Sequence, residues 1–189
     1  MSDQAQMLEG GFGDPARASA MAFRAAMNAM ARPGLVETLR GANPPAPLSI
    51  AAGTLLLTLC DPDTPLYLAG ATDCEAVRNW VRFHTGAPLV GPVTCVFALG
   101  TWDALTPIDQ YPFGTAEYPD RSTTLIVEAA ELHAAGATLS GPGIADTAQL
   151  NLPETAAFQA NAARFPLGCD FFFTCGERLA ALPRSTKVA

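Results

Sequence analysis

Apolar residues recur along the chain in short blocks, and the first block has helical spacing. Asp14 and Pro15 predict a helix start, because aspartate caps free N–H groups and the missing N–H of proline costs nothing at the first position. Three apolar residues then share one helical stripe: Phe23, Met27 and Met30. Pro33 and Gly34 end the helix.

Three further helices are expected. Residues 49–60 are apolar on nearly every side, which predicts a buried helix. Thr72 and Glu75 have the spacing of a capping box, so a helix is expected to run from them to about Phe83. Pro153 is expected to open the last helix, which should reach about Ala163.

Blocks rich in β-formers lie between these helices. The predicted strands cover residues 35–39, 65–69, 93–99, 123–130, 137–140, 170–175 and 178–182. Gly176 and Glu177 form the tight turn of an antiparallel hairpin between the last two strands. Residues 101–120 are expected to be irregular, with one helical turn.

Interleaved helices and strands predict an α/β fold, with a mixed sheet, an antiparallel edge and helices on both faces in a three-layer sandwich. No repeat or linker divides the chain, so residues 1–189 are expected to form a single domain. Residues 1–13 are expected to form a loose N-terminal arm, and residues 184–189 a loose C-terminal tail.

Composition and net charge exclude several classes of protein. The 189 residues are 49% hydrophobic, enough for a sizeable core without disulfides or a metal. The net charge of −7 argues against a general nucleic-acid binder, which needs a basic face. The five cysteines contain no C-x-x-C pair and are expected to be reduced and buried. The start has no signal-peptide pattern and no apolar stretch is long enough to span a membrane, so a cytoplasmic protein is expected.

The sequence lacks the residues that several common kinds of active site require. The only lysine is Lys187, near the end of the chain, so neither a P-loop nor a pyridoxal phosphate Schiff base is expected. His84 and His133 are the only histidines and have no metal-binding spacing, so no metal or cofactor is expected. No G-x-S-x-G string is present. A cysteine nucleophile paired with a histidine remains formally open.

Three polar clusters are candidate binding or contact sites, each with a plain structural alternative. Asp61 and Asp63 stand at a strand entrance, where a turn is the simpler explanation. The second cluster consists of Arg78, Arg82, His84 and Thr85, and its two arginines share one helical face. These residues could bind an anion or an acidic partner. The simpler explanation is a solvated helix face followed by a C-terminal cap. Glu177 and Arg178, at the hairpin turn, are expected to form an ion pair.

Five stretches resemble the PhnH family, the H subunit of the carbon–phosphorus lyase system, and they span nearly the whole chain. They are Phe23-Arg24-x-x-Met27-x-Ala29-Met30-x-x-Pro33-Gly34, Leu55-Leu56-Leu57-Thr58-Leu59 with Asp61-x-Asp63-Thr64-Pro65, Arg82-Phe83-His84-Thr85, Phe165-Pro166-Leu167-Gly168, and Thr174-Cys175-Gly176-Glu177-Arg178-Leu179. The first stretch adds Arg24 to the candidate contact residues. Residues 101–120 match the family poorly.

The resemblance implies a subunit that works with subunits G, I and L to attach a phosphonate to the ribose of ATP, expelling adenine, before an iron–sulfur subunit J breaks the carbon–phosphorus bond. It also implies a homodimer when isolated and a fold like the large domain of pyridoxal phosphate transferases, without that cofactor. Three roles stay open: an accessory subunit with no catalytic residue of its own, a subunit that gives Arg82 or His84 to a shared active site, and a nucleotide-binding module.

Overall fold

The computed structural model describes residues 9–189, and its element order begins with the long helix α2 (Pro15–Ala31). The other helices are α3 (Ile50–Leu59), α4 (Glu75–His84), α5 (Trp102–Leu105) and α6 (Ala156–Ala162). The strands are β1 (Glu37–Thr38), β2 (Leu66–Leu68), β3 (Phe97–Thr101), β4 (Thr124–Glu128), β5 (Ala137–Ser140), β6 (Ala148–Leu150), β7 (Asp170–Cys175), β8 (Arg178–Leu182) and β9 (Lys187–Val188).

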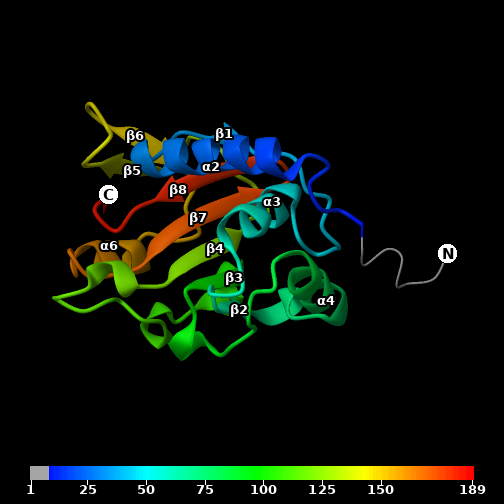
Figure 1. Ribbon diagram of the computed structural model, residues 1–189. Helices are drawn as coiled ribbons and strands as arrows, with labels where there is room; N and C mark the ends of the chain where they lie inside the picture. The colour runs from blue at the N-terminus through cyan, green and yellow to red at the C-terminus, as the bar shows by residue number, and fades with distance from the viewer. Residues whose placement is uncertain (1–8) are drawn as a thin grey trace.

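Six strands form the main sheet, in the order β1-β8-β7-β4-β3-β2 (Figure 1). Strands β2, β3, β4 and β7 are parallel, whereas β8 runs antiparallel to both β7 and β1. Strands β5, β6 and β9 form a small antiparallel sheet. The chain is therefore a mixed α/β fold with an antiparallel edge, as the sequence predicted.

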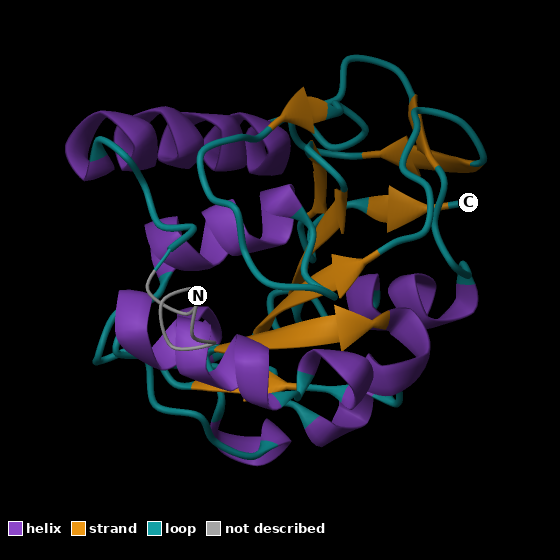
Figure 2. Ribbon diagram, turned by 90° about the vertical axis from the view of Figure 1, so that its right-hand side faces the viewer, coloured by secondary structure: helices purple, strands orange, loops and turns teal. Residues whose placement is uncertain are grey.

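The main sheet is buried on both faces because successive side chains of its strands point to opposite sides. Phe172 of β7 belongs to the core beneath α2, α3 and α4, whereas Phe171 and Phe173 belong to the core beneath α5, α6 and the small sheet. Figure 2 shows the long helix on one side of the strands and the small sheet on the other. These strands read as continuous apolar runs for this reason.

Helix α2 begins as predicted but presents a different face to the core. Asp14 accepts a hydrogen bond from the Arg17 backbone N–H, and Pro15 stands at the first position. Most of the predicted stripe does not face the core, because Phe23 and Met27 are about half exposed, whereas Met30 is partly buried against the core. Three alanines are buried instead: Ala22, Ala26 and Ala29.

The predicted capping box is wrong. Helix α4 is capped at Cys74, and Thr72 lies in a short 3-10 helix, η1 (Gly70–Thr72). The Thr72 hydroxyl is buried and donates to the carbonyl oxygens of Ala69 and Leu99. Thr72 therefore joins η1 to the end of β3 rather than opening α4.

The chain end is also more ordered than predicted. Lys187 and Val188 form β9 against β5, so this segment is not a loose tail. Ahead of it, the guanidinium of Arg184 binds Asp170 and the Pro119 carbonyl oxygen. Residues 1–8 of the predicted N-terminal arm lie outside the described residues. No helix within residues 9–189 is long and apolar enough to cross a membrane.

Other boundaries shifted locally. The Gly176-Glu177 turn and its hairpin are confirmed, and the Gly176 φ of +58° suits a residue without a side chain. Helix α6 starts at Ala156, three residues after Pro153. The segment predicted as irregular holds α5 and two 3-10 helices, η3 (Ile108–Gln110) and η4 (Pro119–Arg121), and β6 was not predicted.

Candidate functional site

Asp61 and Asp63 lie in a closed turn after α3. One carboxylate oxygen of Asp61 accepts from the Asp63 backbone N–H at 2.9 Å and from the Thr64 hydroxyl at 2.5 Å. The turn rests against the end of α4, since a Cβ placed on Gly86 would lie 3.1 Å from the Pro62 ring. The geometry is that of an Asx turn, and a binding role for the two carboxylates stays a prediction.

The two arginines of α4 differ in whether their side chains have an ion-pair partner. Arg78 donates two hydrogen bonds to the Asp73 carboxylate, at 2.5 and 2.7 Å. These hydrogen bonds hold the pKa of Asp73 below its ordinary value. Arg82 lies one turn further along, is exposed, and has no hydrogen-bond or ion-pair partner within residues 9–189. Arg82 is therefore the α4 arginine whose charge is left for a partner or an anion.

His84 and Thr85 close α4. The His84 ring packs on Trp80 and Phe83, and its Nε2 lies 3.2 Å from the carbonyl oxygen of Glu9. The buried Thr85 hydroxyl donates to the Val81 carbonyl oxygen at 2.7 Å. Both side chains stabilise the end of the helix in this arrangement.

The hairpin pair predicted from the sequence does not form. Glu177 accepts from Arg40 Nε at 2.6 Å, so its partner comes from the segment after β1 and not from Arg178. Arg178 is exposed, and Arg24 points outward from α2. The structure thus brings together the α4 residues and the Asp61 turn, and leaves Arg24, Glu177 and Arg178 elsewhere.

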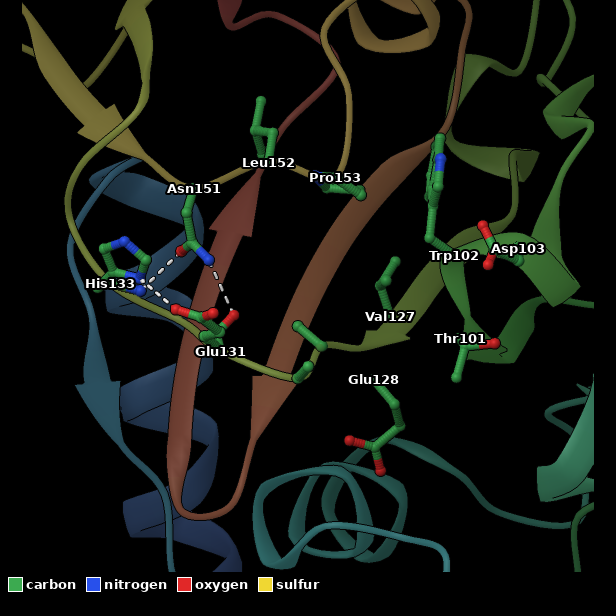
Figure 3. A pocket seen from close by; sticks show the side chains of 12 residues that line it. Thr101, Trp102, Asp103, Val127, Glu128, Glu131, His133, Asn151, Leu152 and Pro153 are labelled. Atoms are coloured by element: carbon green, nitrogen blue, oxygen red, sulfur yellow. Dashed lines mark hydrogen bonds and ion pairs between the residues drawn. The ribbon is translucent and has the colours of Figure 1, made fainter.

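A cleft of about 490 Å³ lies at the carboxyl ends of β3 and β4 (Figure 3). This edge is where parallel α/β sheets usually bind ligands. Its lining comes from the ends of both strands and from the two segments that follow β4 and β6: Thr101, Trp102, Asp103, Val127, Glu128, Ala129, Ala130, Glu131, His133, Asn151, Leu152 and Pro153. Figure 3 shows polar groups from both sides facing the cleft.

Asn151 fixes one wall of this cleft. Its side-chain oxygen accepts from the His133 backbone N–H at 2.7 Å, and its amide nitrogen donates to the Glu131 carbonyl oxygen at 2.9 Å. On the opposite wall, the Trp102 indole N–H donates to Glu154 at 2.8 Å. The side chains of Asn151 and Trp102 are thus held by defined hydrogen bonds.

Glu128 lies at the base of the cleft, where β4 meets α3 and β7. Its carboxylate accepts from the Ser49 backbone N–H at 2.7 Å and from the Thr174 hydroxyl at 2.9 Å. Burial raises the pKa of Glu128, and the two hydrogen-bond partners offset only part of that rise. The carboxylate therefore links three elements of the fold.

The lining of the cleft is acidic. It carries the carboxylates of Asp103, Glu128 and Glu131, and His133 is its only basic side chain. Repulsion between like charges disfavours a triphosphate or phosphonate here. No group of three or more His, Cys, Asp or Glu side chains that could hold a metal ion occurs within residues 9–189. Chemically, the cleft fits a neutral or positively charged group.

Three of the cysteines are buried and fit structural roles, whereas Cys74 and Cys175 are partly exposed, unlike the burial expected from the sequence. Burial raises the pKa of Cys60 and of Cys169 to about 12, and it also raises the pKa of Cys95. Since the thiolate is the nucleophile, these three thiols are poor nucleophiles near neutral pH.

The sequence did not single out the cleft residues. One signal for them existed: Glu128 lies near the end of the strand predicted over residues 123–130, and Glu131 and His133 follow that strand, at the edge where α/β sheets bind ligands. Asn151 could not be found in this way, because it reaches the cleft through β6, which the sequence did not predict.

Comparison with known proteins finds matches that cover nearly the whole chain. Residues 10–189 match the PhnH family, described as "Bacterial phosphonate metabolism protein". The chain is also 40% identical, over an alignment 199 residues long, to the "Alpha-D-ribose 1-methylphosphonate 5-triphosphate synthase subunit PhnH" of Rhizobium meliloti (strain 1021). That alignment covers 100% of this chain and 98% of the relative.

Proposed function

Because this chain belongs to the PhnH family of bacterial phosphonate metabolism proteins, we propose that it is the H subunit of an α-D-ribose 1-methylphosphonate 5-triphosphate synthase in the carbon–phosphorus lyase system. The observation that carries this proposal is the alignment of nearly the full length of both proteins at 40% identity.

In the proposed reaction, a phosphonate oxygen bonds to C1′ of the ribose of ATP while the bond from C1′ to adenine breaks. The proposed partners in this step are subunits G, I and L, with subunit J in the same assembly. The isolated chain is proposed to be a cytoplasmic homodimer, with a fold like the large domain of pyridoxal phosphate transferases and without that cofactor.

We assign the chain an accessory role, and three observations support it. The cleft at the sheet edge is acidic and disfavours anionic substrates. His84 is packed against Trp80 at the end of α4. The pKa values of three buried thiols are raised, which disfavours nucleophilic attack. The substrate-binding charges are then supplied by partner subunits.

Reconstitution from purified subunits tests this role. Adenine release from ATP and methylphosphonate is measured by chromatography for this chain alone, for the other synthase subunits alone, and for the full set. We expect release only from the full set. Turnover by this chain alone would contradict the accessory role, and full activity without it would contradict the proposed function.

Arg82 supports a second candidate, because its guanidinium is exposed and has no partner within residues 9–189. In this alternative Arg82 reaches into a shared active site and binds a phosphate oxygen. Arg82→Ala and His84→Ala are compared in the assembled complex, with Arg121→Ala as an exposed control. Intact assembly with a fall in kcat of about 100-fold or more would favour this alternative. Calorimetry with ATP on the isolated chain tests the third role, a nucleotide-binding module.

A further inference from the structure

The outer surface of α2 combines exposed apolar side chains with arginines. Met21 is 65% exposed, Phe23 51% and Met27 54%. Soluble domains usually turn such residues toward the core, but here the core side of α2 is occupied by alanines. Figure 1 shows α2 lying along the outside of the molecule, over β8. An apolar surface of this kind marks a binding face.

One stripe of this surface combines three polar side chains with one methionine at regular helical spacing. Arg17, Met21, Arg24 and Asn28 recur at intervals of four, three and four residues, so they lie on one helical face. They line a shallow groove of about 390 Å³ that also includes Glu37 of β1. The groove is therefore continuous along about three turns of α2.

The two arginines of the groove outnumber its one acidic residue, Glu37, so its charge is opposite in sign to that of the protein. The chain has a net charge of −7, whereas α2 contains two arginines and no acidic residue. Arg17 and Arg24 have no side-chain hydrogen-bond or ion-pair partner in the part of the chain that the structure describes. Two unpaired guanidinium groups on an acidic protein favour an acidic partner.

We propose that the α2 stripe, Arg17, Met21, Arg24 and Asn28, is the docking surface for an acidic segment with apolar side chains on another synthase subunit. This inference rests on the proposed function and names the surface that the subunit uses. The apolar residues favour a protein over a small anion, because a phosphate would leave Met21 exposed. The arginines are also about 10 Å apart along the helix axis, which suits two separate carboxylates better than one phosphate group.

A second copy of this chain fits the stripe less well. A two-fold symmetric contact places the same patch of both copies together. The contact would then bring the arginines of both grooves together, with Glu37 of each copy to offset only part of their charge, and like charges across an interface disfavour it.

The test measures binding of this chain to an immobilised assembly of subunits G, I, J and L. The variants are the double charge reversal Arg17→Glu with Arg24→Glu, and Met21→Ala. The control is Arg121→Glu, an exposed arginine on η4, away from α2. Because the changed side chains are exposed, thermal unfolding midpoints are expected to stay within about 2 °C of the wild type.

We expect the double charge reversal to weaken binding by about 100-fold or more, and Met21→Ala by about 10-fold, with no change in the control. Wild-type affinity should fall between about 50 and about 300 mM salt, and the double variant should lose most of that dependence. Wild-type binding that both variants retain within about 3-fold overturns the docking surface and leaves the proposed function intact. Loss of the homodimer in sedimentation, with partner binding retained, also overturns it. A wild-type chain that does not bind the assembly contradicts the proposed function itself.

Discussion

Arg184 and Asp170 form a bidentate ion pair that joins the end of β8 to the start of β7. Arg184 Nε lies 3.1 Å from one carboxylate oxygen of Asp170, and Nη2 lies 2.5 Å from the other. The same guanidinium donates to the Ser122 hydroxyl and the Pro119 carbonyl oxygen. One arginine thus holds three segments together.

This pair predicts a large loss of stability on removal. The side chains of Arg184 and Asp170 are only 14% and 23% exposed, so Arg184→Met leaves a carboxylate with little access to water. We expect a loss of about 2–4 kcal/mol in urea unfolding. Arg164→Met is the control, because its pair with Asp109 is 40% and 68% exposed, and it should cost less than about 1 kcal/mol. Equal losses for both variants would show that exposure does not set the strength of the Arg184 pair.

Glu128 predicts a particular pH dependence. Its pKa is raised above the ordinary value of 4.5, so the folded protein keeps this proton to a higher pH than the unfolded chain does. Stability contributed at this site is therefore complete below pH 4.5 and decreases as the pH rises from 4.5 through the raised pKa.

Glu128→Gln should remove this decrease while keeping the acceptor for the Ser49 N–H. The measurement is the free energy of unfolding of both proteins at a series of pH values from about 4 to about 8. We expect the difference, wild type minus variant, to fall with pH across that window. A difference that rises with pH would mean that the hydrogen bonds outweigh the effect of burial.

At Gly53 in α3, we expect a glycine-to-alanine change to lower the stability of the protein, opposite to the usual effect in a helix. Alanine normally stabilises a helix interior by about 1 kcal/mol relative to glycine. A Cβ on Gly53 of α3 would lie 2.5 Å from Cγ of Pro44, which is too close without movement of the loop. We expect Gly53→Ala to destabilise the protein by about 1–2 kcal/mol, because overpacking outweighs the helix preference. Gly91→Ala is the control, since a Cβ there meets nothing within 4 Å.

The cysteines predict a pattern of chemical modification. Cys60, Cys95 and Cys169 are buried with raised pKa values, whereas Cys74 and Cys175 are partly exposed. Iodoacetamide at pH about 8, followed by peptide mass spectrometry, should label the last two first and the other three only on unfolding. Fast labelling of Cys60, Cys95 or Cys169 in the folded protein would reopen the possibility of a cysteine nucleophile.

The elements that the sequence predicted well are those with strong local signals. Asp14 and Pro15 mark the start of α2, and Gly176 and Glu177 mark the hairpin turn, because these residue types satisfy local backbone needs. Local signals failed where a distant segment decided the outcome. Thr72 has the spacing of a capping residue, but the carbonyl oxygen of Leu99 on β3 takes its hydrogen bond.

The candidate site was less predictable for the same reason. The ion pair of Glu177 depends on Arg40, which is 137 residues away in the chain. Apolar spacing also placed Phe23 and Met27 on one stripe of α2 without showing that this stripe faces outward. Which face of a helix is buried depends on the space above the sheet, and the close approach of α2 to β8 and α3 admits alanine rather than phenylalanine.

The alanine underside of α2 has a consequence for recognition. Because the fully buried face of α2 consists of Ala22, Ala26 and Ala29, α2 cannot turn about its axis without driving a larger side chain, such as Met21 or Arg24, into the sheet. The orientation of the outward side chains is thus fixed before any encounter. A rigid scaffold of this kind loses little backbone freedom when a complex forms, so more of the contact energy remains as affinity.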